Sequence, residues 1–204
     1  MWTISLFVIS GCYDLYIRGH MKNYTKQEIL KIILSVAKEY DEKLNDKHFK
    51  ITYQKGKDKE EVVVGFRDMN FLHLTGVKTK LSAQQFYQAC INGKLSERDF
   101  EVDNKGKVQQ KIAVLPYLPN LLYGNCMIGD FINSGIMIRA DYFVGDTRAT
   151  ISVGFKVGKA ADIPVTLYHE DVRKLSHPTC KVLEIWCKRF DEAEYNMCTY
   201  SAKG

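Results

Sequence analysis

Residues 71–80 read Phe-Leu-His-Leu-Thr-Gly-Val-Lys-Thr-Lys, the only stretch in which a histidine, hydroxyl groups, a glycine and two lysines occur together. The pattern predicts a short helix that ends at Gly76, because glycine readily takes the left-handed conformation that follows a helix C-terminus. Asp68 or Asn70 is suited to cap the beginning of this helix. We interpret the stretch as a site for a phosphodiester of RNA, with His73 held in a fixed position and a basic loop behind it. That loop comprises Lys78, Thr79 and Lys80.

A second interpretation of His73 stays open. A histidine that stands between two leucines is also typical of a packed core residue with an internal hydrogen bond. His169 is a further candidate, because it stands at the end of a predicted strand and could reach the same region. A histidine beside acidic residues, as His169 is, more often forms hydrogen bonds at the surface.

The size and composition of the chain predict one globular domain. A chain of 204 residues buries a core without disulfides or a metal, and a hydrophobic fraction of 46% excludes wholesale disorder. The net charge of +5 is compatible with a nucleic-acid partner but does not require one. We expect a single domain over residues 21–190, an N-terminal extension over 1–20 that the natural protein need not contain, and a loose C-terminal tail over 191–204.

The cysteines point to free thiols rather than to a disulfide framework or a metal site. The chain has 6 cysteines, but none forms a CxxC pair and none lies beside a histidine at metal-ligand spacing. We therefore expect no metal and no cofactor, and a reducing cytoplasm, in a bacterial or phage-encoded protein.

Membrane association is not expected either. No stretch approaches the ~20 apolar residues of a membrane span. Residues 9–12, Ile-Ser-Gly-Cys, resemble a bacterial lipoprotein cleavage box, which keeps export as an alternative. An export signal normally has a lysine or arginine before such a box, and this sequence has none there.

Hydrophobic periodicity predicts helices first and an antiparallel sheet last, which is an α+β fold. Capping boxes at Thr25 and Ser82 begin two amphipathic helices, and residues 48–66 alternate as a β-hairpin. Residues 107–125 fit either a helix or a strand. The predicted strands after Cys126 cover residues 127–132, 135–144, 149–157, a segment after Pro164, and 180–188.

The strand predicted over 149–157 has one apolar and one polar face. Thr150, Ser152 and Lys156 share the polar face, and the preceding strand offers Arg139 across the hairpin. Hydroxyl groups with an arginine and a lysine suit a phosphate. The same alternation is equally typical of the solvated face of an antiparallel sheet.

If His73 packs over that polar face, the chain has the parts of a metal-independent ribonuclease. Cleavage through the RNA 2′-hydroxyl needs an acid and a base, a role that histidine fills near neutral pH, and cations for the charged phosphorane. The predicted catalytic residues are His73, Arg139, Thr150 and Ser152. The predicted substrate-binding residues are Lys78, Thr79, Lys80, Tyr142 and Lys156. Tyr142 would stack on a base, although its alternation places it with the core.

Four segments carry a family resemblance: residues 71–76, 82–87, 139–143 and 150–155. In that order they resemble a phage-associated branch of the Barnase–EndoU–colicin–RelE nuclease superfamily, over about residues 48–185. The resemblance implies helices packed on a curved antiparallel sheet and RNA cleavage without metal. It also implies His73 as acid/base and Arg139, Thr150 and Ser152 around the scissile phosphate.

The resulting prediction is a toxin-type endoribonuclease that cleaves RNA, tRNA included, and that would meet an antitoxin or immunity protein. The alternative is a non-catalytic factor of a phage or mobile element that binds nucleic acid or protein. A nucleotide-handling transferase has less support, because the chain lacks a glycine-rich phosphate loop.

Overall fold

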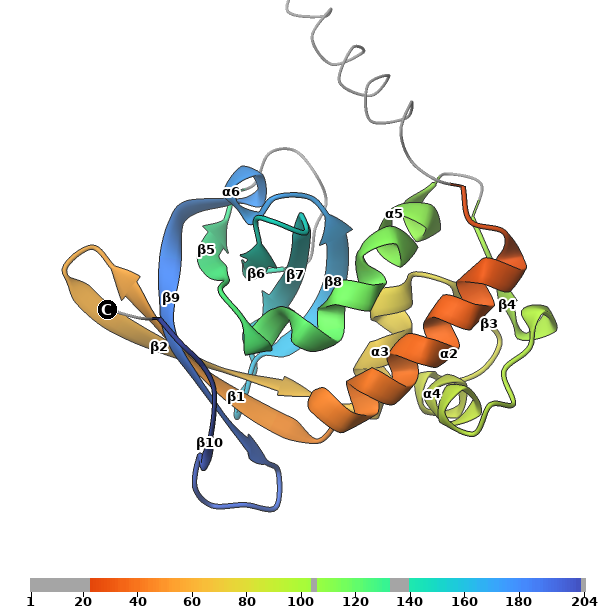
Figure 1. Ribbon diagram of the computed structural model, residues 1–204, viewed down its shortest axis with the longest axis horizontal. Helices are drawn as coiled ribbons and strands as arrows, with labels where there is room; N and C mark the ends of the chain where they lie inside the picture. The colour runs from red at the N-terminus through yellow and green to blue at the C-terminus, as the bar shows by residue number, and fades with distance from the viewer. Residues whose placement is uncertain (1–22, 104–105, 133–139, 203–204) are drawn as a thin grey trace, which may run out of the picture.

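A computed structural model describes residues 23–103, 106–132 and 140–202 of the chain. Figure 1 shows the longer helices gathered on one side of a strongly curved sheet. The helices are α2 (Lys26–Lys43), α3 (Asp68–Thr75), α4 (Ala83–Ile91), α5 (Lys107–Val114) and α6 (Val172–Leu175), with the 3₁₀ segments η1 (Glu97–Asp99) and η2 (Leu115–Tyr123). The α+β class with a curved antiparallel sheet is confirmed.

The strands of this part of the chain form one large sheet and one small ribbon. They are β1 (Lys47–Lys55), β2 (Asp58–Phe66), β3 (Lys78–Thr79), β4 (Phe100–Glu101), β5 (Met127–Phe131), β6 (Tyr142–Asp146), β7 (Ile151–Lys156), β8 (Ile163–His169), β9 (Ser176–Arg189) and β10 (Met197–Ser201). The large sheet has the order β2-β1-β9-β5-β6-β7-β8, and β10 pairs with β9. The ribbon consists of β3 and β4.

Capping chemistry places the first helix where the sequence predicts it. The Glu28 N–H donates to Thr25 Oγ1 over 3.2 Å, and the Thr25 N–H donates to the Glu28 carboxylate over 2.8 Å. The buried stripe of α2 includes Tyr40, whose ring lies 5.0 Å from that of Phe71 and 6.1 Å from that of Phe66. These rings fasten α2 and α3 to the sheet, and each fully buried aromatic contributes about 1.5–3 kcal/mol.

Asp162 closes the curve of the sheet. Its N–H donates to Val63 O and its carbonyl accepts from Gly65 N, each over 2.8 Å, so the loop before β8 pairs with the free edge of β2. Its carboxylate accepts from the Tyr142 hydroxyl over 2.8 Å and from Gly158 N over 3.0 Å. Two ends of the sheet that are far apart in the strand order are therefore held together by one residue.

A second small core covers the outer face of β6 and β7, and it corrects one expectation. Phe143, Val172 and Leu175 pack there, and the side chain of Ser152 is 0% exposed. The polar face predicted for residues 149–157 is therefore buried at Ser152, because α6 lies over it, whereas Lys156 at the end of the strand is exposed.

The boundaries of several strands also differ from the prediction. β7 begins at Ile151, because the preceding residues form a turn in which Thr150 has φ +52°. The strand predicted over 135–144 corresponds to Tyr142–Asp146, and residues 133–139 lie outside the described residues. The segment left open, 107–125, is helical.

The C-terminal tail, expected to be loose, contains β10. Tyr200 of this strand pairs with Ile185 of β9 and packs against the main core. The low apolar content of this segment predicted a loose tail. It is ordered because its backbone pairs with β9 and because the Tyr200 ring packs against the core.

The Asp162 contact leads to a stability prediction. Asp162→Ala leaves the buried Tyr142 hydroxyl without its acceptor, and we expect the free energy of unfolding to fall by about 2–3 kcal/mol. Asp58→Ala, in the exposed turn of the β1–β2 hairpin, is the matched control and should change it by less than about 0.5 kcal/mol. Urea denaturation followed by circular dichroism measures both. Equal values for wild type and Asp162→Ala would show that the sheet closes without this carboxylate.

Candidate functional site

His73 is exposed on a helix whose two ends are fixed. At the beginning of α3 the side chain of Asn70 accepts from Arg67 N over 2.8 Å. At its end Gly76 has φ +76°, and its N–H donates to Leu72 O over 3.3 Å. Phe71 and Leu74 of α3 face the core, while the imidazole of His73 faces solvent. His73 is therefore not a buried core histidine.

Lys111 of α5 lies directly beneath His73. Its Nζ donates to the carbonyl oxygen of His73 over 2.8 Å. Burial, followed by the charge of Lys107, lowers the pKa of Lys111 to about 8. A Cβ atom on Gly76 would lie 2.6 Å from Lys111 Cδ, so a side chain there would displace the Lys111 stem in addition to straining the backbone. A cation at the C-terminus of α3 also stabilises the helix dipole.

No sequence pattern predicted Lys111 as a residue of the site. It is 38 positions from His73, in a segment whose secondary structure the pattern left open. Only the packing of α5 beside α3 brings the two residues together. A lysine with a pKa near neutrality, next to an exposed histidine, is the kind of group that clusters at functional sites.

The basic loop after α3 lines a surface cavity of about 440 Å³. Lys78 and Lys80 are exposed there, and Arg98 adds a third cation from η1. The hydroxyl of Thr79 is already occupied, because it donates to Asp99 O over 2.5 Å and accepts from Leu81 N over 3.1 Å. The two lysines are thus available to an anion, whereas Thr79 joins the loop to η1.

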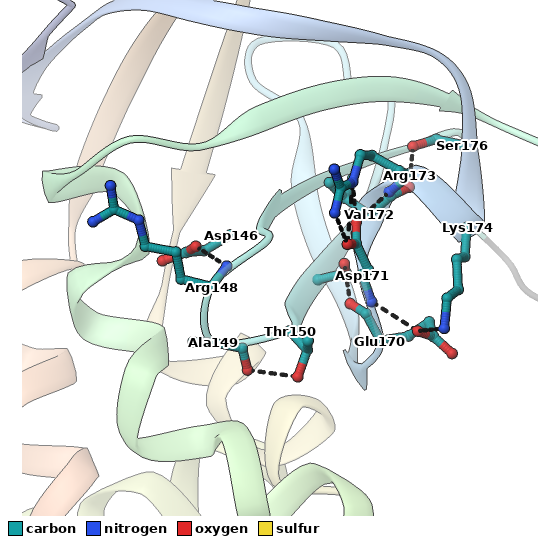
Figure 2. A network of polar contacts seen from close by, with 11 residues as sticks. Asp146, Arg148, Ala149, Thr150, Glu170, Asp171, Val172, Arg173, Lys174 and Ser176 are labelled. Carbon is teal, nitrogen blue, oxygen red and sulfur yellow. Dashed lines mark hydrogen bonds and ion pairs between the residues drawn. The ribbon is translucent and has the colours of Figure 1, made fainter. Parts of the chain in front are cut away.

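Thr150 lies in a different place, where the β6–β7 turn meets the β8–α6 loop (Figure 2). Ser152 reaches the same loop through its hydroxyl group. Thr150 Oγ1 donates to Ala149 O over 2.8 Å, and Ser152 Oγ donates to Glu170 O over 2.7 Å. Around them Arg173 pairs with Asp171 and Lys174 pairs with Glu170. Arg148 extends away from these ion pairs in Figure 2.

The sheet separates Ser152 from His73. A Cβ atom on Gly145 would lie 2.7 Å both from Ser152 Oγ and from Val172 Cβ, so the hydroxyl faces α6. Ile151 and Val153, its neighbours, belong to the main core that α3 covers. Successive side chains of a strand point to opposite faces. His73 therefore does not pack over the face of Ser152, and the condition on which the predicted ribonuclease arrangement depended is not met.

The remaining predicted residues do not join either cluster. Lys156 is exposed at the other end of β7, roughly 20 Å from Thr150 at ~3.3 Å per residue. Tyr142 is buried and stacks on Phe155 with ring centroids 5.5 Å apart, in agreement with its core alternation. Arg139 lies outside the described residues.

The structure also contains a polar cavity of about 250 Å³ that the sequence did not indicate, at the mouth of the curved sheet. Lys55 Nζ lies 3.5 Å from Glu60 and 3.4 Å from Asp130, and both carboxylates raise the pKa of this lysine. With Asp162 the cavity holds three carboxylates and one lysine. An excess of negative charge makes this cavity unfavourable for a phosphodiester.

In the cavity of the basic loop, three cations stand against the two carboxylates of Asp99 and Glu101. Among the described residues, no carboxylate forms an ion pair with Lys78, Lys80, Lys107 or Lys111. In the same part of the chain no three His, Cys, Asp or Glu side chains are placed to hold a metal ion. Among the helices described, none is long and apolar enough to cross a bilayer.

Comparison with known proteins identifies the family. A family model described as phage-Barnase-EndoU-ColicinE5/D-RelE like nuclease4 (PBECR4) matches residues 32–204. Comparisons with curated proteins and with solved structures gave no match. The match covers most of the chain, and helices on a curved antiparallel sheet are the fold that the resemblance implies. The chain belongs to the PBECR4 family of phage-associated nucleases.

Proposed function

We propose that this nuclease is a metal-independent endoribonuclease that cleaves RNA through its own 2′-hydroxyl, with His73 as the acid/base group. The observation that supports the proposal is the exposed imidazole of His73 at the fixed end of α3, next to a lysine whose pKa is lowered to about 8. Family membership supports the nuclease part of the proposal.

The residues suggest a division of roles. His73 would take the proton of the 2′-hydroxyl as its oxygen attacks phosphorus, giving a 2′,3′-cyclic phosphate. The Lys111 ammonium uses one of its donors on His73 O, and the other two can stabilise the charged phosphorane. With a pKa of about 8 it can also give a proton to the leaving 5′-oxygen. Lys78 and Lys80 would hold neighbouring phosphates.

The cluster at the β6–β7 turn remains the alternative position for the same chemistry. It contains Thr150, the guanidinium of Arg148, which forms no ion pair with the residues that the structure describes, and, at the end of β8, the exposed imidazole of His169. Arg139, Thr150 and Ser152 stay predicted as phosphate-binding residues on the resemblance alone. An experiment that compares the two histidines decides between the positions.

We expect His73→Ala to lower RNA cleavage by about 10²- to 10⁴-fold, because an acid/base group contributes this much to a proton-transfer step. His169→Ala is the matched control and should retain wild-type cleavage. The assay uses a fluorescently labelled single-stranded RNA in EDTA, between pH 5 and 9. Denaturation midpoints of both variants establish that they fold.

Three results would count against this assignment. Loss of activity in His169→Ala alone would move the site to the β6–β7 turn. Full activity of His73→Ala would exclude the imidazole. Salt-sensitive RNA binding without any product from the wild-type protein would favour the non-catalytic binding factor.

The pKa of Lys111 leads to a prediction about pH. If its ammonium acts on the phosphorane, kcat/KM should fall as the pH rises through about 8, where the side chain loses its proton. Lys111→Arg should keep its activity up to pH 9 or above, because arginine stays protonated. Lys78→Arg is the control and should leave the alkaline limb at its wild-type position. An unchanged alkaline limb in Lys111→Arg would exclude Lys111 as its origin.

The same lysine makes protein stability depend on pH. Its pKa drops from an ordinary 10.5 to about 8 on folding, so between these values the unfolded chain binds more protons. The free energy of unfolding of the wild type should therefore rise from pH 8 to 10.5, relative to that of Lys111→Met. Lys57→Met, at an exposed hairpin lysine, should follow the wild type across this range. Parallel curves for wild type and Lys111→Met would contradict the lowered pKa.

The cellular role belongs to the same proposal. An enzyme that cleaves RNA or tRNA in the cytoplasm would stop growth of its host cell, and an antitoxin or immunity protein would then be needed to contain it. Induced expression of wild type and of His73→Ala in a bacterium, compared by colony counts, tests whether growth arrest depends on the imidazole.

A further inference from the structure

The outer face of β1 and β9 carries a second group of cations, at the end of the molecule away from the β3–β4 ribbon (Figure 1). Phe49 and Ile51 are fully buried, so the alternate residues His48 and Lys50 face outward. In the pairing of β1 with β9, His48 lies opposite Lys188. Lys50 and Lys188 therefore share one face of the sheet.

Two aromatic rings lie among these cations. Lys50 Nζ lies 5.4 Å and Lys188 Nζ 5.0 Å from the centroid of the Tyr195 ring. The guanidinium carbon of Arg67 lies 4.8 Å from the centroid of Phe190. The segment between β9 and β10 supplies both rings, and each ring is half-buried. We call Lys50, Arg67, Lys188, Phe190 and Tyr195 the outer basic patch.

Among the described residues, Lys50, Arg67 and Lys188 form no ion pair. Lys188 Nζ donates to the carbonyl oxygen of Ala193 over 2.8 Å. The nearest carboxylates bond elsewhere: Glu61 accepts from Thr52 and Glu184 accepts from Trp186. Glu61 is still close enough for its charge, after burial, to raise the pKa of Tyr195.

The positive charge of the patch affects the neighbouring side chain of His48. The pKa of His48 is lowered, first by burial and then by the charges of Lys188 and Arg67. Cations that act together on one region favour an anionic ligand.

We propose that the outer basic patch binds single-stranded RNA, as a site separate from the cleavage site. Cations beside half-exposed rings match the alternation of phosphates and bases in a single strand, where the cations bind phosphates and the rings stack on bases. An acidic protein segment would use the cations alone, and in a duplex the bases are not free to stack. The inference rests on the proposed function for the class of nucleic acid, since RNA is the proposed substrate.

The test measures binding and not cleavage. The probe is a fluorescein-labelled 20-nucleotide single strand of 2′-O-methyl RNA, which lacks the attacking hydroxyl, and fluorescence anisotropy gives its dissociation constant. The variant Lys50→Gln/Lys188→Gln should bind it about 10- to 30-fold more weakly at 0.1 M salt, with a salt slope reduced by roughly 1.4. The matched control is Lys57→Gln/Lys59→Gln, which removes two exposed lysines from the β1–β2 turn and should bind as the wild type does.

Two single variants keep the test decisive if the double variant is unstable. Arg67→Gln removes an exposed guanidinium and keeps the backbone hydrogen bonds of this residue. Tyr195→Leu keeps an apolar side chain and removes the stacking surface, which should weaken binding about fivefold or more. Wild-type affinity in both would overturn the proposal.

The other outcomes are equally clear. Equal weakening by the patch and control variants would show only a general charge effect and would overturn the proposal. Tighter binding of a poly-glutamate peptide than of the RNA, lost in the patch variant, would assign the patch to an acidic protein instead. RNA binding through the patch, with no cleavage of ordinary RNA by the wild type, would support this inference and overturn the proposed function.

Discussion

The structure depends on the closure of its sheet by Asp162. Without that contact, β2 and β8 would both be free edges of an open sheet, and such edges pair readily with other chains. Two backbone hydrogen bonds and the Tyr142 hydroxyl join the ends instead. The closure turns one face of the sheet inward, so Tyr142 and Phe155 pack in the interior. Polar side chains are consequently exposed at the ends of the strands, on the helices and on the outer face of the sheet.

The helix layer then sets the position of the candidate site. α3 ends where it does because Gly76 takes a left-handed conformation and leaves room for the stem of Lys111. That stem brings an ammonium to the carbonyl of His73, and the burial that accompanies this packing lowers its pKa. One packing arrangement therefore fixes the backbone of His73, supplies a cation and lowers the pKa of that cation.

Local sequence patterns predicted most of the fold. The capping boxes at Thr25 and Ser82, the hairpin over 48–66 and the end of α3 at Gly76 are all determined by neighbouring residues, and the structure has them. The burial of Ser152 was not predictable in this way, because it depends on α6, which follows in the chain. The local sequence pattern did not predict β10 for a similar reason, because this strand is ordered by its pairing with β9.

The site was predictable only in part. The exposure of His73 agrees with a functional residue, but its cationic partner Lys111 comes from a distant segment, which periodicity cannot place. NMR of a 2′-deoxy dinucleotide, which binds without being cleaved, titrated into isotope-labelled protein tests the central claim most directly. We predict that the imidazole signals of His73 and the ammonium signal of Lys111 shift, while those of His169 stay unchanged. Shifts confined to His169 and the residues around Thr150 would contradict the account.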